Sequence, residues 1–163
     1  MISLSEAASV ATILSNATGI VDKIYGRFFE MKKGSAPPHE FDPARSAVVE
    51  NDPASSALVL SRQGAEYSKV TYAELQQRLA PGDLRYIKVR EQTMDLLFQQ
   101  WEGAYPTLAL ESDPIRKVQL QQRLKQLTDD LGRELSNVLD FIQNKAQLSL
   151  DDHYLAFRDL AGQ

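Results

Sequence analysis

The chain has 163 residues, of which 43% are hydrophobic, enough to bury the core of one domain but short for two. Its 18 basic and 22 acidic residues give a net charge of -4, whereas nucleic-acid-binding domains usually carry a basic excess, so we expect no nucleic-acid partner. The absence of cysteine excludes disulfides, thiolate catalysis and the commonest structural zinc sites.

The segment 3–32 is expected to form the first long helix. Ser3 and Glu6 fit a capping box, and apolar residues follow from Val10 to Met31 at steps of four and three. The N-terminus has neither the basic residues nor the unbroken apolar run of a secretory signal, so a cytoplasmic protein is expected.

The next segment, residues 34–56, contains several prolines and no hydrophobic period, so we expect a loop-rich surface segment. Two β-favouring runs around the turn SRQG then predict a small β-hairpin near residues 57–71. The rival interpretation is a short helix over 53–64, with Asp52 as its cap and Pro53 as its first residue.

Thr71 and Glu74 form a second capping box, which predicts a short helix over 72–79. A second long helix should begin after Asp83 as N-cap and end at Tyr105, because Pro106 disfavours helical geometry in the residue before it.

A third long helix should open at Asp113 and Pro114, a cap followed by proline, and carry a leucine stripe as far as Ile142. A short helix over 150–161 should then dock on the bundle. Together these elements predict a mainly α protein, an antiparallel bundle of three long helices with shorter helices, in a single domain over 1–163.

The stretch LSLDDHY, residues 148–154, is the part of the sequence that most resembles a catalytic or metal site. We interpret it as a helix start, in which Ser149 and Asp152 form a capping box, because adjacent side chains on a helix point in different directions. His39, the other histidine, lies in the loop-rich segment away from any ligand spacing. We therefore expect no catalytic, cofactor or metal site, and no enzyme.

The expected function is a non-enzymatic scaffold or regulatory protein that binds a protein partner, or a second copy of itself, through its surfaces. Trp101 and Tyr105 are candidate partner contacts, because aromatic side chains commonly anchor interfaces, although their place on the apolar stripe favours core packing. Glu91 is the one polar residue in that stripe and suggests a weaker alternative, a sensor that binds a small ligand between helices.

The low charge of the first helix leaves a further alternative, a membrane-active effector whose helix 3–32 inserts into a bilayer. Glu6 is its only charge before Asp22, and a basic cluster follows near its far end. The candidate membrane-contacting residues are Val10, Ile13, Leu14, Ile20, Lys23, Arg27, Lys32 and Lys33.

Overall fold

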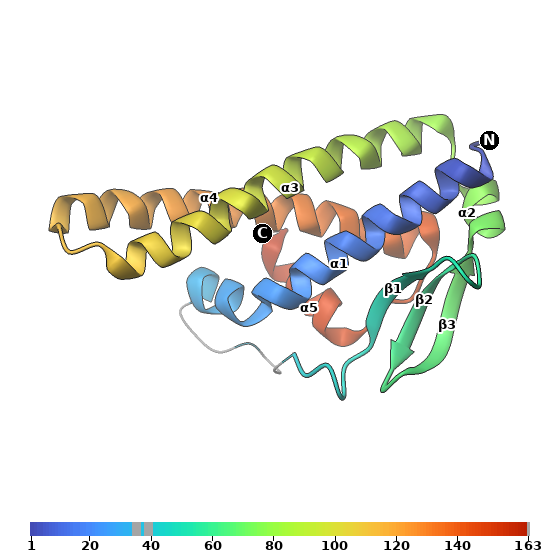
Figure 1. Ribbon diagram of the computed structural model, residues 1–163, viewed down its shortest axis with the longest axis horizontal. Helices are drawn as coiled ribbons and strands as arrows, with labels where there is room; N and C mark the ends of the chain where they lie inside the picture. The colour runs from blue at the N-terminus through green and yellow to red at the C-terminus, as the bar shows by residue number, and fades with distance from the viewer. Residues whose placement is uncertain (34–36, 38–40, 163) are drawn as a thin grey trace.

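The computed structural model describes residues 1–33, 37 and 41–162, and it confirms a mainly α fold with three long helices. These are α1 (Leu4–Lys33), α3 (Pro81–Leu110) and α4 (Pro114–Phe141), which pack together as Figure 1 shows. α4 runs antiparallel to the other two, whereas α1 and α3 run in the same direction. The chain returns between α1 and α3 through a small sheet and the short helix α2 (Tyr72–Arg78).

Local capping contacts fix several helix starts as the sequence predicts. At α1, the Ser3 N–H donates to Glu6 Oε1 at 2.9 Å and the Glu6 N–H donates to Ser3 Oγ at 3.1 Å. The capping box of Thr71 opens α2 in the same way, and Asp113 Oδ1 accepts from the backbone N–H of Ile115 at 3.0 Å at the start of α4. For α3 the expected cap was wrong. The helix begins two residues before Asp83, whose side chain reaches back to the cap instead.

α3 also continues past Pro106 to Leu110, so its expected end at Tyr105 was wrong. A proline inside a helix removes the hydrogen bond to the carbonyl four residues earlier, here that of Glu102. Glu102 and Pro106 are both exposed, so water can replace the missing N–H. The turn that follows is held by Leu108, which packs against the core.

The sheet has three antiparallel strands in the order β1 (Val48–Asp52), β2 (Ala57–Arg62) and β3 (Ala65–Thr71). The hairpin predicted near 57–71 is confirmed, and the rival helix over 53–64 is wrong. The expected loop-rich segment 34–56 was too long, because β1 lies inside it and pairs with β2, Val49 opposite Leu60. Residues 34–36 and 38–40 of that segment, His39 among them, lie outside the described residues.

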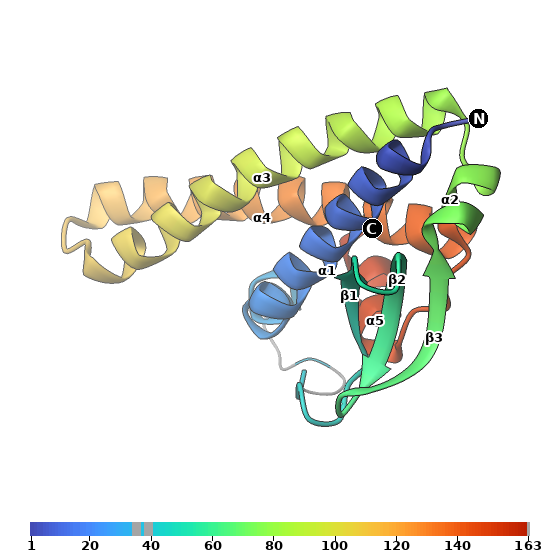
Figure 2. The same cartoon turned by 45° about the vertical axis from the view of Figure 1, so that its right-hand side comes forward.

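The sheet is fixed by its turn and by burial of its central strand. Gln63 and Gly64 both adopt positive φ, 55° and 77°, as the tight turns that match strand twist require. Leu58 and Leu60 of β2 are fully buried, and β1 is joined to α1 by a hydrogen bond of 3.0 Å from the Asn51 side chain to Thr12. The sheet therefore covers one side of α1, as Figure 2 shows from a second angle.

After α4 the chain makes one π-helical turn, η1 (Ile142–Ala146), and turns at Gln147 with a φ of 60° before α5 (Asp152–Ala161). The predicted docking helix is thus confirmed, but its expected cap is wrong. Asp151 is the N-cap, in place of Ser149. α5 packs against α1, with the rings of Phe157 and Phe28 4.3 Å apart.

Candidate functional site

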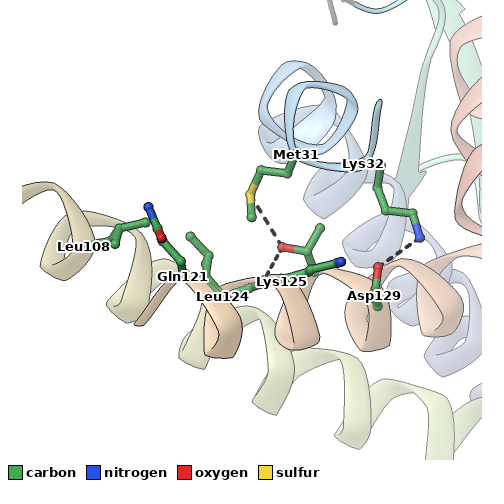
Figure 3. A pocket seen from close by; sticks show the side chains of 8 residues that line it. Met31, Lys32, Leu108, Gln121, Leu124, Lys125 and Asp129 are labelled. Carbon is green, nitrogen blue, oxygen red and sulfur yellow. Dashed lines mark hydrogen bonds and ion pairs between the residues drawn. The ribbon is translucent and has the colours of Figure 1, made fainter. Parts of the chain in front are cut away.

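A groove opens where α1 ends against the other two long helices. It has a volume of about 420 Å3 and lies between the end of α1, the last turns of α3 and the middle of α4 (Figure 3). We call it the distal groove; its lining residues are Met31, Lys32, Leu108, Gln121, Leu124, Lys125, Thr128 and Asp129.

The polar side chains in the distal groove differ in whether they already have partners. Lys32 Nζ lies 2.9 Å from Asp129 Oδ1 and neutralises it. Thr128 Oγ1 accepts from Trp101 Nε1 at 3.0 Å and donates to the Leu124 carbonyl at 2.7 Å. Within the described part of the chain, Lys125 forms no ion pair, so the groove holds a cation that is free to bind an anion.

Beyond this groove the two antiparallel helices extend past the end of α1 (Figure 1). We call residues 108–122, the turn between α3 and α4 with its flanking helical turns, the distal hairpin. Three of its large apolar side chains are exposed: Leu110 at 86%, Ile115 at 72% and Val118 at 51%. Val89 and Leu96 of α3 are also exposed. Large apolar groups gathered on a protruding element are typical of an interaction surface.

The first half of α4, most of which belongs to the distal hairpin, is basic although the whole chain is acidic. Residues 114–125 contain four basic residues, Arg116, Lys117, Arg123 and Lys125, and no acidic one. The first turn of α4 accordingly has no acidic residue. Such a local excess of positive charge favours an acidic partner surface.

A second cluster of polar groups is buried where α1 and α5 meet. His153 is fully buried, with its Nε2 atom 3.2 Å from Asp22 Oδ1 and its Nδ1 atom 3.2 Å from Asp151 Oδ2. The Tyr154 hydroxyl donates to Asp22 Oδ2 at 3.1 Å, and Arg62 of β2 pairs with Asp151 at 2.9 Å. The cluster therefore joins α1, the sheet and α5.

The surroundings shift the pKa values of this cluster in different directions. Burial raises the pKa of Asp22, although hydrogen bonds from His153 and Tyr154 act against that shift. Burial also acts to raise the pKa of Asp151, but the Ala47 N–H, His153 and Arg62 outweigh it, so the pKa of Asp151 is lowered. Burial and the neighbouring Asp22 raise the pKa of Tyr154.

The interpretation of LSLDDHY as a helix start is confirmed, and two of its residues, Asp151 and His153, also belong to this cluster. Asp151 has extended backbone geometry, with φ -71° and ψ 162°, so its side chain can face His153 two residues later. Both ring nitrogens of His153 already face carboxylates, and no part of the residue is exposed, so a substrate cannot reach it. Among the described residues, no group of three or more histidine, aspartate or glutamate side chains is arranged to hold a metal ion.

The structure places the three candidate contact residues of α3 in different surroundings. Trp101 is buried and belongs to the core. Tyr105 is partly exposed, and the Arg27 guanidinium lies over its ring, 4.6 Å from the centroid. Glu91 is partly exposed and lies outside the lining of the distal groove. Partial burial and the nearby Asp95 raise its pKa.

The candidate membrane-contacting residues lie on α1, whose apolar side chains belong to the core. Val10, Ile13, Leu14 and Ile20 are all buried. The basic residues Lys23 and Arg27 lie over the rings of Phe98 and Tyr105, and Lys32 is paired with Asp129; the side chain of Lys33 lies outside what the structure describes. Insertion of this helix would require the core to open. In the described residues, no helix combines the length and the apolarity needed to cross a bilayer.

Sequence reasoning missed most residues of the distal groove and hairpin, because they come from three helices far apart in the chain. Part of the signal was present: Ile115 and Val118 fall outside the leucine stripe of α4, so a helix that buries the stripe must expose them.

No family model, curated protein or solved structure matches this chain.

Proposed function

We propose that this chain is a non-enzymatic interaction protein, a scaffold or regulator, that binds a protein partner through its distal hairpin. The observation that carries the proposal is the exposure of Leu110, Ile115 and Val118 on an element that extends beyond the rest of the bundle. An exposed apolar group gains free energy when a partner covers it, by about 25 cal/mol for each Å2 removed from water.

The buried cluster around His153 supports a role without catalysis. A general base must come within hydrogen-bond reach of a substrate proton, and His153 is enclosed by protein on every side. Its two carboxylate partners instead link elements that are distant in sequence, as expected of a structural contact. A cytoplasmic location, expected from the sequence, stays part of this proposal.

The test is affinity capture from a lysate of the source cells with the immobilised protein and with the double variant Leu110→Asp, Ile115→Asp. Both side chains are exposed, so the double variant should fold normally, with a change in stability within about 0.5 kcal/mol for each substitution. We expect the wild type to retain specific partners that the double variant loses.

The matched control is Leu4→Asp, which places the same change on a leucine that is 53% exposed, at the opposite end of the molecule. This control should retain the same partners as the wild type. Equal capture by all three proteins would refute a role for the distal hairpin. Light scattering on the same samples detects a second copy as the partner, as a dimer that the double variant converts to monomer.

A further inference from the structure

The distal groove next to the hairpin has a chemistry of its own, and it specifies what kind of partner fits. We propose that the distal groove binds an acidic amphipathic segment of the partner protein, with an apolar side chain between Met31, Leu108 and Leu124 and a carboxylate on Lys125. This inference rests on the proposed function, because it assigns the partner's chemistry to the surface beside the distal hairpin.

The apolar side of the argument comes from the groove itself. Met31, Leu108 and Leu124 come from α1, α3 and α4 and surround one hollow (Figure 3). The volume, about 420 Å3, falls within the range of about 300–1,000 Å3 found for pockets that enclose small molecules, so it has room for an apolar side chain of a partner. A concave site of this kind suits a single inserted side chain, as in the recognition of amphipathic helices by grooves.

The charge of the groove selects an acidic ligand over a basic one. Asp129, the acidic residue in the lining, is already paired with Lys32 and so adds little repulsion. Lys125 then remains to bind a carboxylate. Lys117 and Gln121 lie eight and four residues earlier on α4, so the three side chains share one face of the helix and can contact successive turns of a bound segment.

Two basic residues at the start of α4 also lie where an isolated helix disfavours positive charge. Arg116 and Lys117 lie in the first turn of α4, where the helix dipole disfavours positive charge. Asp113 reaches Arg116 at 3.9 Å, at the outer limit of an ion pair, and Lys117 has no ion-pair partner in the described residues. The fold of the chain does not require basic residues at this end of α4. An acidic partner would offset their unfavourable interaction with the helix dipole.

The test uses two synthetic amphipathic helical peptides of about 18 residues, about 27 Å long, that share a leucine face. One has glutamate on its polar face and the other has lysine. Binding to the full-length protein is followed by fluorescence anisotropy, and the site is located by amide shifts in NMR spectra. We expect the glutamate peptide to bind with shifts at Gln121, Leu124 and Lys125, and the lysine peptide to bind at least tenfold more weakly.

Two charge reversals separate a specific site from general electrostatic attraction. Lys125→Glu should weaken binding of the glutamate peptide about tenfold, or about 1.4 kcal/mol. Lys69→Glu makes the same change of charge at an exposed position of β3 and should leave the affinity unchanged. Met31→Ala, checked for folding by circular dichroism, should weaken binding of both peptides by removing part of the apolar contact.

Three results would overturn the proposal. These are no binding of the glutamate peptide at about 1 mM, equal loss of affinity in both charge reversals, and binding of anionic phosphatidylglycerol vesicles through Lys125 without binding of the peptide. If the peptide fails while capture still depends on Leu110 and Ile115, the distal hairpin binds a partner of different chemistry and only this inference is wrong. If capture also fails to depend on those residues, the proposed function is wrong as well.

Discussion

Two glycines in the long helices predict opposite effects of the same substitution. A Cβ atom at Gly132 of α4 would lie 2.7 and 2.9 Å from two ring atoms of Phe28 and 3.3 Å from the Cβ of Ala161. Carbon atoms in van der Waals contact are about 3.5–4.0 Å apart, so the added methyl group cannot fit without movement. The Phe28 ring cannot retreat easily, since it packs against Phe157 at 4.3 Å.

The change in the free energy of unfolding that each substitution causes is the sum of two opposing contributions. Replacing glycine by alanine inside a helix stabilises it by about 1 kcal/mol, and overpacking a core costs about 1–3 kcal/mol. Gly132→Ala should therefore lower the free energy of unfolding by up to about 2 kcal/mol. Gly103→Ala has no atom within 4 Å of its added Cβ and should raise the free energy of unfolding by about 1 kcal/mol.

Urea unfolding followed by circular dichroism measures both variants beside the wild type. The difference between the two variants cancels the helix-propensity contribution and leaves the overpacking cost of about 1–3 kcal/mol. Equal stabilisation by both substitutions would refute the packing of α1 and α5 around Gly132. A loss of stability in Gly103→Ala would instead place that residue in a contact that the structure does not contain.

The remaining predictions concern single side chains and the first helix. Asp151→Asn should lower the free energy of unfolding at pH 7 by about 1.5–3 kcal/mol, through the loss of charged hydrogen bonds. Because the fold lowers the pKa of Asp151, its charged form stabilises the protein above the ordinary pKa of 3.8, and this stabilisation is lost as the pH falls. The difference in free energy of unfolding between the variant and the wild type, measured by urea unfolding, should therefore shrink in acid. A difference that stays constant with pH would contradict this reasoning. Trp101→Phe removes the buried hydrogen bond to Thr128 and should cost about 1–3 kcal/mol in the same assay, whereas an unchanged midpoint would mean that this bond contributes nothing. Glu91→Gln should stabilise the fold at pH 7 by less than about 0.5 kcal/mol, because the fold raises the pKa of Glu91 and so disfavours its charge; destabilisation would indicate an ionic partner instead. The folded protein should release no dye from anionic liposomes, because the apolar residues of α1 lie in the core, and release by a protein that stays folded would restore the membrane-active alternative.

The features that the sequence predicts well are those decided by neighbouring residues. The Ser3–Glu6 and Thr71–Glu74 boxes and the Asp113 cap each join residues two or three positions apart, so their patterns are complete in the sequence. The hairpin turn at Gln63 and Gly64 is local in the same sense.

The features that it misses depend on distant partners. β1 is a strand because β2 pairs with it, and its own sequence offers only two consecutive valines as a signal. α3 passes through Pro106 because the core holds the turn beyond it, which local rules do not include. The Asp22–His153 contact joins positions 131 residues apart, so the motif at 151–153 could not reveal it.

The distal hairpin and the distal groove were predictable only in part, because the hairpin is local and the groove is not. Exposure of Ile115 and Val118 follows from the leucine stripe of α4, a property of one helix. The distal groove requires the end of α1 to lie against α4 more than ninety residues later in the chain, as the pairing of Lys32 with Asp129 shows. No period or spacing in one segment contains that information.

The contact between α1 and α5 also sets the order in which the protein can fold during its synthesis. The ring of Phe28 is covered by Phe157, so the apolar face of α1 stays incomplete while more than a hundred residues are added. At a translation rate of about 5–20 residues per second, that interval lasts about 6–25 s. During that interval the Phe28 ring lacks the cover that Phe157 gives it in the folded protein.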